Sequence, residues 1–146
     1  MYCLAERHLS SIQKAIQSAH AIVEYSLEYG DDEEYRQWAR NDKTIIILDG
    51  ATLPEMRLTD DLLNRSGIRY ATFAEPDMGN MLTAICFLAD ERVWDYERFG
   101  RSYKDFECIS FALADVCVTE EDWVKSIGGE GNRIKKEIVS SLKLAL

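Results

Sequence analysis

The sequence lacks any long hydrophobic run, and no secretory leader is recognisable at its N-terminus. No apolar stretch approaches the roughly 20 residues that a helix needs to cross a bilayer. The first residues also lack the positively charged segment and apolar core that make up a signal peptide. We therefore expect a cytoplasmic protein without a membrane partner.

Cysteine and histidine are both scarce. The chain has four cysteines and two histidines, with no C-x-x-C pair and no histidine at zinc-finger spacing. Three of the cysteines lie within apolar runs, which is typical of reduced, buried thiols rather than of a disulfide framework. We expect no metal and no cofactor. The cysteines are Cys3, Cys86, Cys108 and Cys117.

Positive charge is also in short supply. Lysine and arginine number 17 against 26 acids, which gives a net charge of −9 and a pI near 4.7. Such a chain repels the phosphate backbone of nucleic acids unless its basic residues gather on one face. DNA binding and nonspecific RNA binding are therefore disfavoured, although a local basic pocket formed by Arg7, Lys14, Arg69 and the basic final helix remains open.

The regular elements alternate between strand and helix over the first two thirds of the chain. Short β-branched and apolar runs predict strands, and three-to-four-residue apolar steps predict helices. This order indicates an α/β sandwich with a mixed sheet. Strands are expected at 1–6, 43–50, 68–74 and 81–89, and helices at 8–30, within 31–42, and at 53–68.

The first helix carries an apolar stripe that we expect to face the core. At about 100° per residue, His20 lies at the edge of this stripe, Gln17 borders it, and Lys14 turns toward solvent. Taken alone, these polar residues are more typical of a solvated flank than of a site. The stripe consists of Leu9, Ile12, Ile16, Ala19, Val23 and Leu27.

Two further segments give expectations about packing. The short helix within 31–42 should turn Tyr35, Trp38 and Ala39 inward, and the continuous apolar run of 43–50 suits a strand buried on both faces.

The C-terminal third differs in composition, with a charged and aromatic segment at 91–120 and a basic final helix. Thr119 followed by three acids predicts a helix N-cap. We expect one domain over 1–146 with an elaborated end. The aromatic cluster favours packing of this segment or a subunit contact, with base stacking as the alternative. The cluster is Trp94, Tyr96, Phe99, Tyr103 and Phe106.

A tight turn lies between the last two expected strands, in the segment FAEPDMGNMLTAI. Pro76 and Gly79 mark the turn. Asp77 and Asn80 suit hydrogen bonds to their own backbone, and Thr83 suits a strand. By itself this turn is more typical of structure than of catalysis.

Taken together, the two segments resemble the peptidyl-tRNA hydrolase 2 family over about residues 1–90. The helix matches its Gln-x-x-His-Ala signature at Gln17, His20 and Ala21, and the turn matches its Asp-x-Gly…Thr loop at Asp77, Gly79 and Thr83. The resemblance implies a three-layer α/β/α sandwich with a mixed sheet of about four strands. It also implies metal-independent hydrolysis of the ester that joins a peptide to the 3′ end of tRNA.

The resemblance also implies roles for single residues. Asp77 would orient or deprotonate the attacking water, and Lys14 would offer positive charge to the oxyanion or to a phosphate. Gln17 and Thr83 would position the substrate by hydrogen bonds. The implied catalytic residues are Lys14, Asp77 and Thr83, and the implied substrate-binding residues are Arg7, Gln17, His20 and Asn80.

The acidic charge keeps a second class of function open. A protein of this fold that has lost hydrolysis would still bind a small nucleotide, such as a signalling molecule, and sequester it. The segment 91–120 would then act as a lid or as the interface of a homo-oligomer. A purely structural interaction module is the third alternative.

Overall fold

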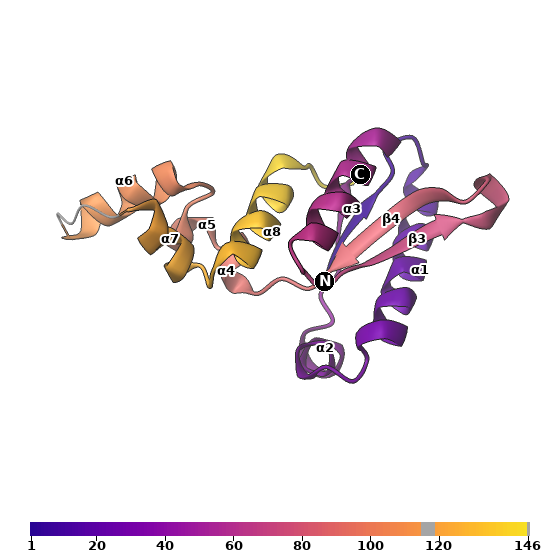
Figure 1. Ribbon diagram of the computed structural model, residues 1–146, viewed down its shortest axis with the longest axis horizontal. Coiled ribbons are helices and arrows are strands. Elements are labelled where there is room, and N and C mark those ends of the chain that lie inside the picture. The colour runs from indigo at the N-terminus through magenta and orange to yellow at the C-terminus, as the bar shows by residue number, and fades with distance from the viewer. Residues whose placement is uncertain (115–118, 146) are drawn as a thin grey trace. The chain divides into compact units, whose positions relative to one another are not determined.

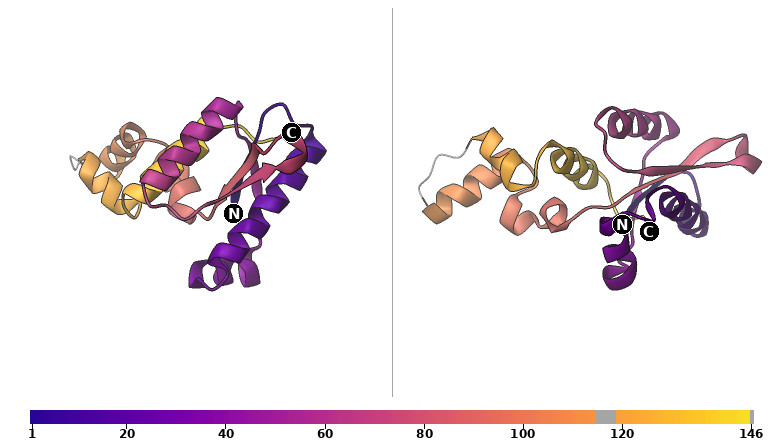
Figure 2. Two further views of the ribbon diagram at one scale, coloured as in Figure 1. Left: turned by 45° about the vertical axis from the view of Figure 1, so that its right-hand side comes forward. Right: turned by 60° about the horizontal axis from the view of Figure 1, so that its bottom comes forward.

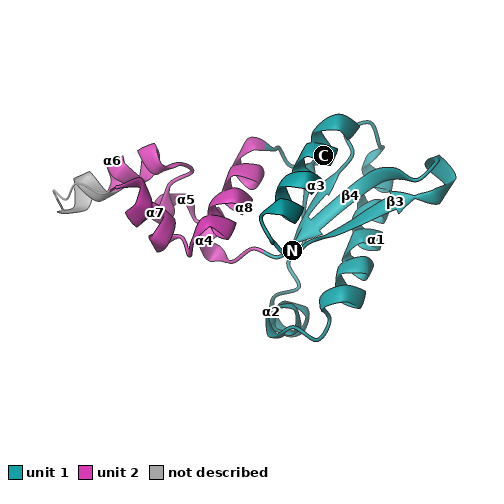
Figure 3. Cartoon of the chain, in the orientation of Figure 1, with its two compact units in different colours: residues 1–88, 142–146 teal, residues 89–141 magenta. Residues whose placement is uncertain are grey.

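The computed structural model describes residues 1–114 and 119–145, with the side chains of residues 108 and 110–114 excepted (Figure 1). The chain forms two compact units, residues 1–88 with the chain end from 142, and residues 89–141 (Figure 3). The division falls close to residue 91, where the composition of the sequence changes. Within the described ranges, no helix is both long enough and apolar enough to span a bilayer.

The first unit is mixed α/β and is built on a four-stranded mixed sheet, as the sequence predicts (Figure 1). The strand order is β2-β1-β4-β3. β1 pairs parallel with β2 and antiparallel with β4, and β3 pairs antiparallel with β4. The elements are β1 (Tyr2–Ala5), α1 (Ser11–Tyr29), α2 (Glu33–Gln37), the π-helix η1 (Trp38–Asp42), β2 (Ile46–Asp49), α3 (Leu53–Arg65), β3 (Ala71–Glu75), the 3₁₀ turn η2 (Pro76–Met78) and β4 (Met81–Phe87).

α1 and α3 cover opposite faces of the sheet (Figure 2). Side chains alternate along a strand, so Cys3 and Cys86 face Ala21 and Tyr25 of α1 in one core cluster. The alternate positions of β1 and β4 face the other way, where α3 buries two of its side chains completely. The residues of this second face are Leu4, Ile85 and Phe87 of the sheet, with Met56 and Leu63 of α3.

The expectation that residues 43–50 form a strand buried on both faces is wrong. β2 is the edge strand of the sheet, and Ile45, just before it, is 49% exposed. Leu48 of β2 is buried. The free edge of β2 is partly covered by the chain end, through an antiparallel bridge between Leu48 and Leu144. The apolar run therefore reflects an edge that another segment partly covers, not a central strand.

The expected core face of the first helix is also wrong. The buried residues of α1 are Lys14, Gln17, Ser18, Ala21 and Tyr25, and they project about 180° away from the predicted stripe. The physical reason lies in the surface that receives the helix. The sheet presents small residues and thiols to Ala21 and Tyr25, and it presents polar groups to Lys14 and Gln17. Of the predicted stripe, only Leu9, which precedes the helix, is buried.

Tyr35 and Trp38 pack against the core cluster under α1, as the sequence predicts. The Trp38 indole N–H donates to the carbonyl of Thr44 (2.9 Å). This contact ties the π-helix to the segment that leads into β2.

The second unit is helical within the described residues. Its helices are α4 (Glu91–Trp94), α5 (Tyr96–Phe99), α6 (Tyr103–Ala114), α7 (Glu120–Ser126) and α8 (Glu130–Ser141). Thr119 caps α7 by accepting from the Asp122 N–H, which confirms the predicted N-cap.

The aromatic cluster of the second unit is largely internal. Phe99 forms a core with Trp123 and Ile127, and Tyr103 and Phe106 pack against it. The packing interpretation is therefore confirmed for these three predicted members of the cluster. Trp94 is 52% exposed, and the Tyr96 ring lies 4.8 Å from the ammonium of Lys136.

Lys136 is fully buried in the second unit. Its Nζ donates to the carbonyls of Arg92 and Val93, both at 3.0 Å, near the end of α4. Burial lowers the pKa of this lysine to about 8, because removing an ammonium from water penalises its charged form.

Candidate functional site

The ends of three strands bring polar residues to one edge of the sheet, which we call the carboxyl edge. Glu6 directly follows β1, Asp49 ends β2, and Glu75 ends β3. β1, β2 and β3 all run in the same direction, because β4 is antiparallel to both of its neighbours. Their carboxyl ends therefore meet at one edge, where α/β proteins commonly place ligands. Thr83 lies near the start of β4, which reaches the same edge because β4 runs in the opposite direction.

Lys14 and Arg7 both approach Asp49 at this edge. The Lys14 Nζ lies 3.7 Å from Asp49 Oδ1, and the Arg7 Nε lies 3.9 Å from Asp49 Oδ2. Lys14 is 7% exposed, contrary to the expectation that it turns toward solvent. Asp49 Oδ1 is buried and has no hydrogen-bond partner among the described residues. Two cations thus share one carboxylate, which leaves unused hydrogen-bonding capacity on the Lys14 ammonium and on Asp49.

Gln17 and Thr83 are in direct contact, although 66 residues separate them in the sequence. The Thr83 hydroxyl is fully buried and donates to Gln17 Oε1 (2.7 Å). The Gln17 amide in turn donates from Nε2 to Glu75 Oε2 (2.6 Å). This chain of hydrogen bonds fixes the Gln17 amide on the same face of α1 as Lys14.

Two further predicted residues, His20 and Asn80, make their ring and hydrogen-bond contacts with other groups than Lys14, Gln17 and Thr83. The His20 ring stacks on Phe73, with centroids 4.5 Å apart, so it braces α1 against β3. Asn80 has φ 57° and donates its backbone N–H to the Glu75 carbonyl (3.0 Å), which suits its expected role in the turn.

Asp77 lies in η2 and is exposed. Its backbone N–H lies 3.5 Å from Glu75 Oε1. Within the described part of the chain, no hydrogen bond or ion pair joins Asp77 to Lys14 or Thr83. Its catalytic role stays a prediction.

Sequence reasoning missed Glu6 and His8. Glu6 is 3% exposed, and its two oxygens accept from the His8 backbone N–H and contact Nδ1, both at 2.7 Å. With Nδ1 as the donor, Nε2 is left as the basic nitrogen of a side chain that is 75% exposed. A carboxylate that orients a histidine is a recurring arrangement for general bases. The available signal was an acid at the carboxyl end of a strand, which also identifies Asp49.

The cysteines of the first unit do not supply a nucleophile. Cys3 and Cys86 are free and buried beneath α1. Burial raises the pKa of the Cys3 thiol to about 12 and raises the pKa of Cys86 as well. Neither forms a thiolate near neutral pH. The side chain of Cys108 and the whole of Cys117 lie outside the described residues.

Among the residues that the structure describes, no group of three or more histidine, cysteine, aspartate or glutamate side chains is placed to hold a metal ion.

Arg69 does not join Arg7 and Lys14. It precedes β3 at the end opposite Glu75, where it pairs with Asp32 (3.1 Å). It borders a cleft of about 380 Å³ there, in which Tyr29 and Tyr70 take part. The Tyr70 hydroxyl donates to Asp60 (2.7 Å). The predicted basic pocket at the site is thus limited to Arg7 and Lys14 within the first unit.

Comparison with protein-family models, with curated proteins and with solved structures finds no match for this chain.

Proposed function

We propose that the carboxyl edge performs metal-independent ester hydrolysis of the peptidyl-tRNA hydrolase type, on the three-layer sandwich that the family resemblance implies. The observation that carries this proposal is the hydrogen bond between Gln17 and Thr83, with Lys14 buried one helical turn before Gln17. These residues come from the two distant segments on which the resemblance rests. Their contact supports a shared site, because neither segment alone explains why such polar groups are buried.

The proposed chemistry assigns one task to each group. A water attacks the ester carbonyl, and a basic side chain takes its proton. The tetrahedral intermediate then collapses by breaking the bond to the 3′ oxygen of the tRNA, which leaves as the hydroxyl after it receives that proton. His8, held by Glu6, is the group best prepared for the role of base, and Asp77 is the base that the resemblance implies. The Lys14 ammonium stabilises the oxyanion, while Gln17 and Thr83 hold the substrate in place.

The substrate is limited by charge. Asp49 already offsets much of the positive charge of Lys14 and Arg7, and the chain carries −9 in total. Affinity for many phosphates would therefore be modest. We expect recognition to concentrate on the terminal nucleoside and its acyl group rather than on the body of a tRNA.

The small number of cations at the carboxyl edge also supports the second candidate, a protein that binds a small nucleotide without hydrolysing it. One or two phosphates match the two cations of the edge better than a polyanion does. Base stacking by the aromatic cluster gives little support to this candidate, because Phe99, Tyr103 and Phe106 pack inside the second unit.

The test is hydrolysis of an N-acetyl-aminoacyl-tRNA by the full chain. The two histidines give a matched pair of variants, His8→Gln and His20→Gln. His8→Gln keeps a donor for Glu6 but removes the base, so kcat should fall by about 10²- to 10⁴-fold. His20→Gln should keep kcat, because His20 stacks on Phe73.

Asp77→Ala completes the test. Loss of turnover in Asp77→Ala with full turnover in His8→Gln would transfer the role of base to Asp77. Absence of turnover in the folded wild-type chain would reject hydrolysis of this ester. Calorimetric titration with nucleoside mono- and diphosphates would then test the binding candidate, with Lys14→Met as the variant expected to lose affinity.

A further inference from the structure

Asp49 lies between the two cations of the carboxyl edge. Its Oδ1 is 3.7 Å from the Lys14 Nζ, and its Oδ2 is 3.9 Å from the Arg7 Nε. Both distances exceed the roughly 2.7–3.2 Å of a hydrogen bond, so Asp49 offsets the charge of the two cations without occupying their N–H donors. Two cations and one carboxylate leave a single net positive charge beside donors that a ligand can use. We call the space beside these three groups the phosphate position.

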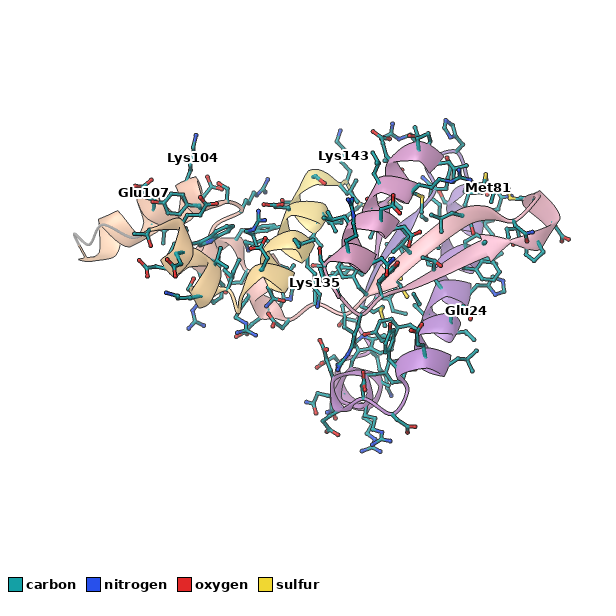
Figure 4. The ribbon with its side chains drawn as sticks, in the orientation of Figure 1. Glu24, Met81, Lys104, Glu107, Lys135 and Lys143 are labelled. Carbon is teal, nitrogen blue, oxygen red and sulfur yellow. The ribbon has the colours of Figure 1, made fainter. Side chains whose placement is uncertain are left out.

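The backbone of Asp49 is bound on both sides. Its N–H donates to the carbonyl of Lys143 in the chain end (2.8 Å), and the N–H of the next residue, Gly50, donates to the carbonyl of Ala5 on β1 (2.7 Å). Lys143 contributes only this carbonyl, because its side chain is exposed (Figure 4) and forms no ion pair with Asp49 within the described residues. The Asp49 carboxylate is therefore a fixed part of the charge of the phosphate position.

The other two acids of the carboxyl edge do not make this balance more positive. Glu6 accepts from the His8 backbone N–H and contacts the His8 ring, both at 2.7 Å. Glu75 accepts from the Gln17 amide at 2.6 Å. A protonated His8 would only offset Glu6, and the Gln17 amide is neutral. A ligand at the phosphate position therefore meets no more than one net positive charge.

The net charge of the phosphate position limits the charge of its ligand. The attraction between ligand and site grows in proportion to the charge of the ligand, whereas the cost of removing an ion from water grows with the square of its charge. One net positive charge therefore suits a monoanion better than a dianion. A phosphodiester carries one negative charge, whereas a terminal phosphate group carries about −1.5 to −2 at pH 7.

We propose that Asp49 is the specificity-determining residue of the carboxyl edge, and that it restricts the phosphate position to a phosphodiester, the linkage that precedes the terminal nucleoside of an RNA chain. The inference rests on the proposed function, because it takes this edge as the place where a phosphate of the substrate binds. It adds the class of ligand, which is the end of an RNA chain rather than a free nucleotide with a terminal phosphate. It thereby separates the two candidate functions.

Two matched ligands test the proposal, adenosine 5′-monophosphate and its methyl phosphodiester. They differ by one methyl group and, at about pH 8, by one charge. The Kd of each is measured with the full chain by NMR titration at low ionic strength, where charge interactions are screened least. The wild-type chain should bind the diester at least as tightly as the monophosphate.

Asp49→Asn should reverse this preference, because it doubles the net charge of the phosphate position and keeps the shape of the side chain. Each negative charge of a ligand gains the same attraction. A gain of about tenfold for the diester therefore corresponds to a gain of about a hundredfold for the monophosphate. Asp61→Asn is the matched control, because Asp61 is an exposed acid of α3 and the change in net charge is the same. It should alter the ratio of the two Kd values by less than about twofold.

Arg7→Gln tests the same balance in the opposite direction and covers the case in which Asp49→Asn does not fold. The Arg7 side chain is 52% exposed, so its loss disturbs packing little. Removing this cation leaves no net positive charge on Lys14 and Asp49 together. The affinity for the monophosphate should therefore fall about tenfold more than the affinity for the diester.

The outcomes separate this inference from the proposed hydrolysis. A diester preference that Asp49→Asn reverses would support the inference even if the chain shows no turnover. A ratio of Kd values that Asp49→Asn changes no more than Asp61→Asn does would overturn it even if the chain hydrolyses its ester, and so would a wild-type chain that binds the monophosphate more tightly. Absence of binding of both ligands at millimolar concentration, in the wild-type chain and in Asp49→Asn, would reject the phosphate position itself. Circular dichroism of each variant establishes that it is folded.

Discussion

Replacing Thr83 with valine tests whether the link between α1 and the carboxyl edge stabilises the fold. Valine matches threonine in shape, so the change removes the hydroxyl and little else. The hydroxyl has a single hydrogen, which lies between two acceptors, Gln17 Oε1 at 2.7 Å and the Phe73 carbonyl at 3.1 Å. The hydrogen points mainly toward the nearer acceptor, Gln17 Oε1, so Thr83→Val chiefly removes the hydrogen-bond donor of Gln17.

The Gln17 amide has no simple way to recover. Rotating it would turn Oε1 toward the Glu75 carboxylate, which now accepts from Nε2 at 2.6 Å, and two acceptors would then face each other. Gln17 is only 6% exposed, so water cannot readily replace the lost donor. Leaving a buried acceptor without a partner costs about 1–3 kcal/mol.

Urea unfolding followed by circular dichroism measures this cost. With a slope of about 2 kcal/mol per molar urea, a loss of about 2 kcal/mol lowers the midpoint by about 1 M. Thr72→Val on β3 is the matched control, because no hydrogen bond of the Thr72 side chain is seen in the described part of the chain. It should shift the midpoint by much less.

A double variant sharpens the test. Thr83→Val/Gln17→Met removes both partners, so it should cost less than the sum of the two single changes. Additive losses, or a Thr83→Val midpoint that matches the Thr72→Val midpoint, would refute the reasoning that this hydrogen bond holds α1 to the sheet.

Three further outcomes follow from other buried groups. The folded-state pKa of Lys136, about 8, lies below the ordinary 10.5; between these values Lys136 binds more protons in the unfolded chain, so its contribution to the free energy of unfolding should rise with pH by up to about 3 kcal/mol. The buried thiols Cys3 and Cys86, whose pKa values are raised, lower the stability over part of the same window, so the quantity to measure in urea titrations is the difference between the wild-type chain and Lys136→Met. A difference that does not change with pH would contradict the burial argument. Gly50→Ala places a methyl group 2.8 Å from the Ala5 carbonyl oxygen and should cost about 1–3 kcal/mol, measured by urea unfolding; a neutral result would mean that β1 and β2 separate easily at this edge. In a chain with Cys108→Ser and Cys117→Ser, Cys3 and Cys86 should react with a thiol reagent at pH 8 only after unfolding, because burial raises the pKa of both thiols, and rapid labelling of the folded chain would contradict this.

The regular elements were largely predictable from the sequence, because their signals are local. The apolar runs at 43–50 and 81–89 contain β2 and β4. Pro54 stands in the first turn of α3, and Gly67 follows its last turn with φ 62°. Thr119 caps α7 through Asp122. Each of these features depends on backbone restrictions or on hydrogen bonds between neighbours in the chain.

Part of the site was also accessible at the level of sequence, but only through family resemblance. Gln17 and Thr83 meet at 2.7 Å, and no spacing rule joins residues so far apart in the chain. Glu6 and Asp49 were missed because both fall at the ends of the runs that predict strands, 1–6 and 43–50, where a single acid gives no signal of a site. Their significance appears only when the parallel strands bring both to one edge.

The sequence by itself determined where strands and helices form, whereas the tertiary structure decided which face of α1 is buried. Periodicity placed Ile16 and Val23 on a single face, and that is correct, but it assigned this face to the core. The sheet instead receives Lys14 and Gln17 on its polar edge and Tyr25 on its small core residues. A helix can bury either face, and the choice depends on the complementary groups that other strands supply. Those groups come together only when the chain is folded.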